Sequence, residues 1–385
     1  MERAGFLARW LAANANRRSV EELFPAFCEK LVRYGLPVWR ASLGLEVLHP
    51  EVSGSLHVWT SEELSTRESA RATAGTSQSY LNSPTRIVDE TERPFRRRLD
   101  VPCPDMPVLE ELRLLGATDY VMFPLPFLDR TRTAVISFAT RQEGGFTPVE
   151  LDMLKFTANI VSPSIERHVL HRIAVDLLDT YVGPRTGRRI IEGRVDRGAA
   201  DLIEAAIWFT DLRGFTRLSE TVPIEDVLTI LNAWFEIVGE VVDAHGGEVL
   251  KFIGDAVLAI FPTSADRDRS GACRDALAAA QSFCRRVDSL NEAREVAGEA
   301  PLAFGLALHV GEVAYGNVGA RRRLDFTVIG PAVNQASRLQ ELSKDLGHRV
   351  LISRSCAQEV DMRLVDLGHH PVRDIEQPQR VFTLP

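Results

Sequence analysis

The sequence predicts an α/β protein with two domains, in which a long helix separates two regions that contain short strands. The chain of 385 residues is long for one hydrophobic core, because domains usually contain about 100–200 residues. Short apolar runs bounded by turn residues occur in both halves, as is typical of strands and hairpins. Between them, apolar residues recur at every third or fourth position from Leu154 to Leu177, which predicts a helix of about seven turns.

Composition and charge limit the classes of function. Hydrophobic residues make up 45% of the chain and charged residues 25%, as in soluble globular proteins. The net charge of −8 argues against a nucleic-acid-binding module, which usually carries a basic surplus. Of the 45 basic residues only four are lysines, so a lysine at any given position is unusual in this chain. They are Lys30, Lys155, Lys251 and Lys344.

The sequence predicts a cytoplasmic protein without a membrane-spanning segment. The longest charge-free apolar run, residues 301–311, is much shorter than the ~20 residues that a spanning helix needs. Arg9 interrupts the apolar residues near the start of the chain, so no signal-peptide core is expected. The five cysteines are scattered and lack CxxC spacing, which favours reduced thiols over a disulfide framework or a zinc site.

After an N-terminal segment (residues 1–19), the first half of the chain predicts a small sheet with helices. Apolar residues at helical spacing predict a helix over about residues 20–45. Strands are expected at 43–48, 56–59, 120–125 and 134–140. The polar stretch at about 60–105 is expected to be loop with one short helix, and residues 129–131 are expected to form the turn between the last two strands.

The long helix begins with a capping box, because Thr147 stands three residues before Glu150. Its apolar stripe continues past the first domain, and Pro163 is expected to kink it. Such a stripe is covered either by its own domain, as in an ordinary domain helix, or by the same helix of a second copy. Because one domain is not expected to cover the whole stripe, we favour a parallel dimer stalk and linker over residues 150–184.

The order of elements in residues 20–168 is helix, hairpin, loops, hairpin and capped helix, and it resembles a GAF-type sensor domain. The most family-like segments are residues 121–125 (VMFPL), 138–140 (FAT) and 145–147 (GFT). The resemblance implies a regulatory domain with an antiparallel sheet. Its input would be a small molecule or a protein, which the sequence does not identify.

Two aspartates in the second half of the chain are expected to meet at one edge of a sheet. Residues 205–211 predict a strand that ends in Asp211, and residues 248–261 predict a β-hairpin with Gly254 and Asp255 at its tip. If the hairpin pairs with the strand, the two carboxylates lie together. Two carboxylates without histidine or cysteine suit a hard cation such as Mg²⁺, bound jointly with substrate phosphates. Taken alone, an aspartate at a strand end is more often a turn or cap residue.

Three motifs in order extend this hypothesis: residues 209–216 (FTDLRGFT), 250–255 (LKFIGD) and 325–339 (DFTVIGPAVNQASRL). Together they resemble the catalytic domain of class III nucleotidyl cyclases, the adenylate and guanylate cyclases, across about residues 185–385. The resemblance implies a ferredoxin-like α/β domain that acts as a homodimer, with each active site shared between the two copies.

The resemblance also implies metal-binding and base-binding residues. Asp211, Asp255 and the backbone of Leu212 would hold two divalent cations, Mg²⁺ or Mn²⁺. Lys251 and Thr327 would contact the purine. Asp325 is an alternative to Thr327, because strand alternation points both side chains to the same face.

Arginines and one asparagine complete the implied site. Asn334 and Arg338, which share one face of a helix at i, i+4 spacing, would orient the ribose and stabilise the transition state. Arg373 would bind the terminal phosphates. Arg321 or Arg322 would add a further phosphate contact, and a solvated surface is the alternative interpretation of the arginine run 321–323.

These residue types agree with cyclisation of ATP, in which the ribose 3′ oxygen attacks the α-phosphorus and pyrophosphate leaves in line. Lys251 donates and Thr327 accepts, which complements adenine N1 and the adenine amino group. Guanine would need a carboxylate, and neither of these two positions holds one. We therefore expect a homodimeric adenylate cyclase that forms 3′,5′-cyclic AMP and pyrophosphate. A guanylate cyclase and a catalytically silent nucleotide-binding partner remain alternatives.

Overall fold

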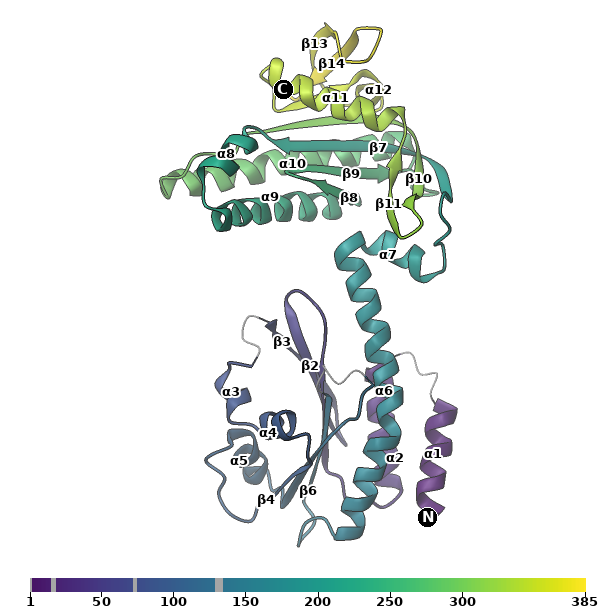
Figure 1. Cartoon of the computed structure of the whole chain (residues 1–385), viewed down its shortest axis with the longest axis vertical. Helices are drawn as coiled ribbons and strands as arrows, with labels where there is room; N and C mark the ends of the chain where they lie inside the picture. The colour runs from purple at the N-terminus through teal and green to yellow at the C-terminus, as the bar shows by residue number, and fades with distance from the viewer. Residues whose placement is uncertain (1, 15–18, 72–74, 129–133) are drawn as a thin grey trace. The chain divides into compact units, whose positions relative to one another are not determined.

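The computed structural model describes residues 2–14, 19–71, 75–128 and 134–385. They form two compact units, Met1–Thr180 and Tyr181–Pro385. Each unit has one β-sheet with helices packed on it, which confirms the predicted α/β fold class (Figure 1).

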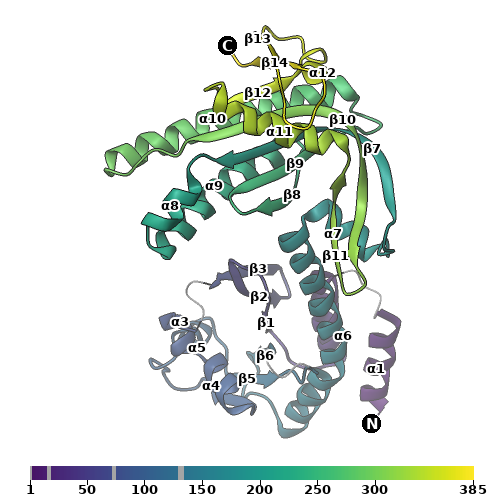
Figure 2. The ribbon, with the colours of Figure 1, turned by 45° about the horizontal axis from the view of Figure 1, so that its top comes forward.

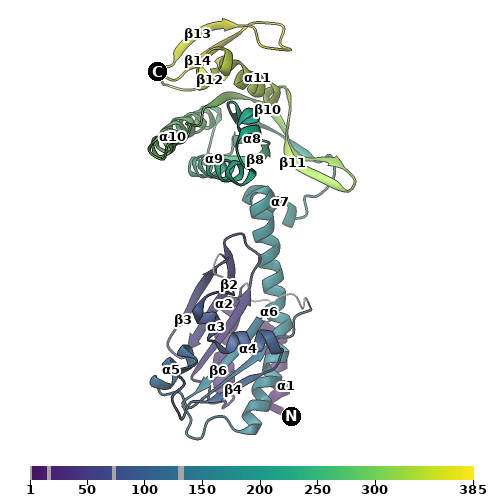
Figure 3. The same cartoon turned by 60° about the vertical axis from the view of Figure 1, so that its left-hand side comes forward.

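The first unit is built on a six-stranded antiparallel sheet among the described residues, with the strand order β3-β2-β1-β6-β5-β4. The strands are β1 (Arg40–Glu46), β2 (Val52–Thr60), β3 (Leu64–Ala70), β4 (Phe95–Arg98), β5 (Asp119–Pro124) and β6 (Ala134–Thr140). The helices are α1 (Glu2–Asn14), α2 (Val20–Arg33), α3 (Gln78–Leu81), α4 (Pro84–Thr91), α5 (Pro107–Leu114) and α6 (Pro148–Val182). Helices α2 and α6 cover one face of the sheet, and α3, α4 and α5 lie on the other (Figure 3).

The structure corrects two predictions in this unit. The first helix does not reach residue 45: α2 ends at Arg33, because Gly35 adopts a positive φ of 81° and Pro37 follows, and the chain then enters β1. The polar stretch 60–105 is not loop with one short helix, since it contains β3, α3, α4 and β4. Strands β3 and β4 lie at the two edges of the sheet and are partly or fully exposed, so they lack the alternation of apolar residues that predicts a strand. The turn predicted at 129–131 lies outside the described residues.

The predicted capping box is confirmed at the start of α6. The Thr147 N–H donates to Glu150 Oε2 at 2.7 Å, and the Glu150 N–H donates to Thr147 Oγ1 at 3.3 Å. Helix α6 continues through Pro163 to Val182.

The stripe on α6 is buried within its own unit. Its residues from Leu154 to Ile173 belong to the same hydrophobic core as α2 and the sheet, and Leu177 packs against that core. The expectation that one domain cannot cover the stripe was wrong, because α2 and the sheet together extend along the helix. The dimer stalk stays a prediction that this stripe no longer supports.

The second unit contains an eight-stranded sheet among the described residues, with the order β13-β14-β12-β10-β7-β9-β8 and with β11 paired to β10. The strands are β7 (Ala200–Leu212), β8 (Glu248–Ile253), β9 (Ala256–Pro262), β10 (Phe304–Ala320), β11 (Arg323–Ile329), β12 (Val350–Ser353), β13 (Val365–His370) and β14 (Gln379–Thr383). The helices are α7 (Pro184–Ile191), α8 (Phe215–Thr221), α9 (Ile224–Ala244), α10 (Arg269–Val296), α11 (Pro331–Asp345) and α12 (Arg354–Ala357). Strands β10 and β11 form a long two-stranded ribbon (Figure 2).

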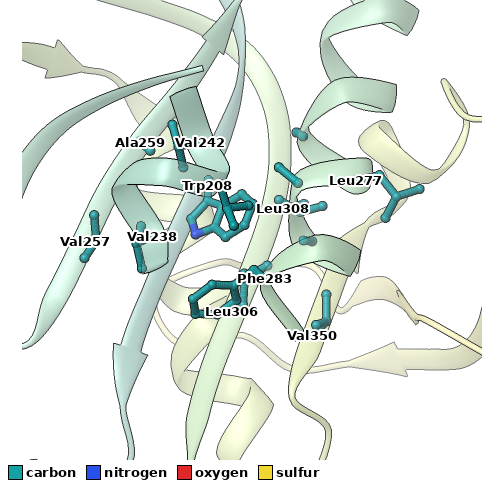
Figure 4. Packing of buried hydrophobic residues seen from close by; sticks show 14 of the residues in the cluster. Trp208, Val238, Val242, Val257, Ala259, Leu277, Phe283, Leu306, Leu308 and Val350 are labelled. Atoms are coloured by element: carbon teal, nitrogen blue, oxygen red, sulfur yellow. The ribbon is translucent and has the colours of Figure 1, made fainter. Parts of the chain in front are cut away.

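Alternation along β7 divides the core of this unit between the two faces of the sheet. Trp208 packs against α9 and α10, and its ring meets Phe283 of α10 edge-to-face (Figure 4). Trp234 of α9 contacts the same Phe283 ring, so the three side chains form one aromatic cluster. Ile207 points to the opposite face and packs with residues of α11. No helix in the described part of the chain is both long and apolar enough to cross a membrane.

Acid is expected to destabilise this core through His309 of β10, which is 7% exposed. Burial, with a contribution from Arg269, lowers the pKa of His309 to about 4. The unfolded chain binds this proton from about pH 6.5 downward, so stability is lost as the pH falls from about 6.5 to about 4. Between pH 7 and pH 5 the loss is on the order of 2 kcal/mol.

The test is urea unfolding of the wild type and of His309→Gln at both pH values. The variant should lose less stability than the wild type between pH 7 and pH 5, whatever its stability at pH 7. An equal loss in the two proteins would contradict the assignment.

Candidate active site

The two predicted aspartates lie at one edge of the second sheet. Strand β9 pairs with β7, as expected, so the tip of the β8–β9 hairpin comes next to the end of β7. The Leu212 N–H donates to Asp255 Oδ2 at 3.1 Å. Gly254 supplies the positive φ of 64° that the tight turn requires, and the Trp234 indole donates to the Asp255 carbonyl at 3.1 Å. The hairpin tip is therefore tied both to β7 and to the core.

Without a bound cation, the ionised form of both carboxylates is disfavoured. Burial, followed by the charge of Asp255, raises the pKa of Asp211 to about 6, against the opposing charges of Arg213 and Lys344. Burial also raises the pKa of Asp255, and the N–H donated by Leu212 opposes this shift. A bound cation would offset the desolvation and the mutual repulsion of these groups.

The donor set fits hard divalent cations. Two carboxylates are oxygen ligands, as Mg²⁺ and Mn²⁺ prefer. Among the described residues, no cluster of three or more histidine, cysteine, aspartate or glutamate side chains could hold a metal ion. The remaining ligands would therefore be backbone oxygens, such as that of Leu212, together with water and substrate phosphates.

The predicted base-binding residues come from two neighbouring strands. Lys251 of β8 donates to Asp325 Oδ2 of β11 at 2.6 Å, and this ion pair lowers the pKa of Asp325. Thr327 pairs with Gly316 in the same ribbon and is buried. Neither Lys251 nor Thr327 is a carboxylate, but Asp325, the alternative to Thr327, lies directly against Lys251, because β11 folds back beside β8.

The structure brings two of the predicted arginines together. Arg338 of α11 donates to Asp374 Oδ2 at 3.1 Å and to Glu341 Oε1 at 2.9 Å. The Arg373 guanidinium lies 3.6 Å from the same Asp374 oxygen. Asn334 is exposed one turn before Arg338. Arg321 and Arg322 are exposed in the turn between β10 and β11.

Within one chain these arginines do not reach the paired aspartates through any ion pair among the described residues, since Arg338 pairs with Glu341 and Asp374. Helix α11 does contact the aspartates, but through another residue. The buried Gln340 donates to Asp211 Oδ1.

Sequence reasoning missed Gln340 and Asp374. The glutamine approaches β10 at Gly305, where an added Cβ would lie 2.7 Å from Gln340 Nε2. A glycine inside a strand signals such a close approach but does not identify the partner. Nothing in the sequence near Asp374 predicts its contact with Arg338, which lies 36 positions earlier.

Comparison with known proteins shows what the second unit is similar to. Residues 199–383 match the family described as the adenylate and guanylate cyclase catalytic domain. The chain is 36% identical to adenylate cyclase 1 of Rhizobium meliloti over 185 residues, which cover 47% of this chain and 27% of that protein. It is 35% identical to an adenylate cyclase of Anabaena cylindrica over 182 residues, which cover 45% of this chain and 35% of that protein.

A solved structure of a bacterial light-regulated adenylyl cyclase is also similar, with a TM-score of 0.50 and 26% identity over 58% of this chain and 64% of that chain. The second unit belongs to the adenylate and guanylate cyclase catalytic domain family. The chain spans about a third of the length of the curated relatives it matches, 27% and 35% in the two cases above. The GAF-type resemblance of the first unit stays a prediction.

Replacing Asp211 by asparagine is expected to stabilise the metal-free chain at pH 8. Because the folded pKa of about 6 lies above the ordinary 3.8, Asp211 stabilises the fold when protonated, and this stability is lost as the pH rises through about 6. Asparagine removes the charge, so Tm at pH 8 should rise by about 2–4 °C, with a smaller change at pH 5.

Thermal unfolding in a chelator measures the effect. Asp266→Asn, at an exposed acid of the same unit, controls for the loss of one negative charge. A lower Tm of Asp211→Asn at pH 8 than the wild type would contradict the electrostatic account.

Proposed function

We propose that the protein is an adenylate cyclase that converts ATP to 3′,5′-cyclic AMP and pyrophosphate, at sites shared between two copies of the chain and under control of the N-terminal unit. The observation that carries the proposal is the meeting of Asp211 and Asp255 at one sheet edge in a domain of the cyclase family. Two adenylate cyclases among the relatives support the choice of reaction.

The proposed roles follow from chemistry and position. Asp211 and Asp255 would hold two divalent ions, which lower the pKa of the ribose 3′ hydroxyl and offset charge on the leaving phosphates. The new bond joins O3′ to the α-phosphorus, the bond to the bridging oxygen of pyrophosphate breaks, and the hydroxyl proton is released. Asn334 would orient the ribose. Arg338 would neutralise the charge that develops on the α-phosphoryl oxygens.

The substrate would be held at both ends. Arg373, with Arg321 or Arg322, would bind the terminal phosphates as guanidinium groups do. Lys251 would donate to adenine N1, and Thr327 would accept from the amino group. Lysine suits this position because its single ammonium group is narrower than a guanidinium fork.

Two observations support a site completed by a second copy. Arg338 pairs with Asp374 and not with Asp211 in the same chain. Near the base-binding residues, apolar side chains on β8 and β11 are exposed: Phe252 by 52%, Ile253 by 48% and Ile329 by 50%. An exposed apolar patch of this kind is typical of an interface.

Asp255→Ala tests the metal role. Loss of one carboxylate should reduce Mg²⁺- or Mn²⁺-dependent formation of cyclic AMP at least about 100-fold, while Tm and oligomeric state stay close to the wild type. Asp266→Asn, an exposed acid in the same unit, should retain full activity. Undiminished turnover in Asp255→Ala would contradict the site.

A guanylate cyclase is the second candidate, and Asp325 favours it. Guanine presents N–H donors that a carboxylate would accept, and Asp325 lies 2.6 Å from Lys251. Turnover of ATP and GTP, measured in parallel, decides between the two. Formation of neither product by the wild-type chain would leave a catalytically silent nucleotide-binding partner.

Lys251→Ala is expected to lower the ratio of kcat/KM for ATP to that for GTP about tenfold, because one base-specific hydrogen bond is lost. Asp325→Asn should leave ATP preference within about threefold of the wild type if Thr327 is the acceptor for the amino group. Lys155→Ala, at an exposed lysine of the first unit, is the matched control. Unchanged selectivity in Lys251→Ala would contradict the assignment of the base site.

A further inference from the structure

One carboxylate of the second unit stands between the two arginines proposed to bind the nucleotide. Asp374 lies between β13 and β14 and adopts a left-handed backbone conformation, with φ of 60°. It is one of two residues other than glycine with positive φ in the described part of the chain. This conformation costs an ordinary L-residue roughly 1 kcal/mol, although aspartate and asparagine tolerate it better than most.

The contacts of Asp374 converge on a single oxygen. Asp374 Oδ2 accepts from Arg338 at 3.1 Å and lies 3.6 Å from Arg373 Nε. The side chain of Asp374 is 68% exposed and that of Arg373 is 73% exposed, whereas that of Arg338 is 29% exposed. Arg338 also pairs with Glu341, so the partly buried guanidinium keeps one carboxylate partner without Asp374. Exposed ion pairs of this kind contribute little to folding stability.

The same guanidinium groups are proposed to bind phosphate oxygens. A carboxylate and a phosphate present similar oxygen acceptors to arginine and both carry negative charge. Arg338 and Arg373 therefore cannot give their full charge to a triphosphate while Asp374 remains paired with them. Any triphosphate that reaches the arginines also approaches the Asp374 carboxylate, which repels it.

We propose that Asp374 is a counter-ion that occupies Arg338 and Arg373 in the nucleotide-free chain and competes with the substrate phosphates for them. The inference rests on the proposed function, which assigns these arginines to the nucleotide. Asp374 sets the affinity for the triphosphate and contacts no reacting atom. Asp374→Asn removes the charge and keeps a side chain that tolerates the left-handed backbone.

A role of Asp374 in positioning Arg338 would have the opposite effect on kcat and on triphosphate affinity. If Asp374 held Arg338 in its working orientation, its loss would lower kcat and leave triphosphate affinity unchanged or weaker. If it competes with phosphate, its loss strengthens binding, and kcat changes little.

The experiment measures equilibrium binding of magnesium tripolyphosphate to the full chain by calorimetry, together with KM and kcat for ATP. Asp374→Asn should bind tripolyphosphate about two- to fivefold more tightly than the wild type, from the usual strength of an exposed ion pair. KM should fall by a similar factor, with kcat within about twofold. Asp374→Gly should show the same gain in tripolyphosphate affinity, and high salt should reduce the difference in affinity between each variant and the wild type.

Asp366→Asn is the matched control. It removes one negative charge from the neighbouring strand β13, where Asp366 pairs with Arg380 away from Arg338. This variant should bind tripolyphosphate as the wild type does. Equal gains in Asp366→Asn and Asp374→Asn would overturn the proposal, since net charge alone would explain them.

The tripolyphosphate binding measurement tests the role of Asp374 independently of the proposed cyclase activity. Absence of cyclic product from both ATP and GTP would overturn the proposed function, whereas tripolyphosphate binding would still decide on Asp374. Unchanged or weaker binding in Asp374→Asn, or no binding to any of the variants and the wild type, would overturn the role of Asp374. A fall in kcat at unchanged affinity would reassign it as a positioning residue.

Discussion

The antiparallel pairing of β7 with β9 on one side and β10 on the other is the constraint on which the second unit depends. It places β7 at the centre of the sheet, where alternation decides the direction of every side chain. Trp208 points into the core formed with α9 and α10. Ile207 and Asp211 share the other face, where α11 supplies Gln340 to the Asp211 carboxylate. A one-residue slip of this strand would exchange the aromatic core and the carboxylate.

One residue of α9, Trp234, contacts both the hydrophobic core and the candidate active site. Trp234 packs edge-to-face against Phe283 in the core, and its indole N–H donates to the backbone carbonyl of Asp255 at the hairpin tip. A well-packed core can hold two desolvated carboxylates close together, although their repulsion opposes folding. Helix α7 contacts the same hairpin, because Thr186 donates to Glu248 at the start of β8, the strand that carries Lys251. The contact made by α7 and the proposed base-binding Lys251 thus lie on one strand.

The apolar stripe of the long helix α6 is covered within the first unit. The stripe on α6 packs along α2 and the sheet to Ile173, so the amphipathic pattern reflects a domain core. Sequence periodicity measures how much apolar surface a helix carries, and it does not identify which surface covers it. The edge strands β3 and β4 are partly or fully exposed and carry no alternation of apolar residues, so the sequence pattern does not predict them.

The sequence by itself determined the fold class, the capping box of α6, the strand that carries Asp211 near its end and the hairpin tip at Asp255, because turn residues and local periodicity act over a few positions. Three motifs also indicated the family of the second unit. Only the tertiary structure decided which charged groups meet. Lys251 pairs with Asp325, 74 positions later in the sequence, and Arg338 pairs with Asp374, 36 positions later. Such pairings depend on how strands and helices from distant segments pack, and no short-range pattern in the chain encodes that packing.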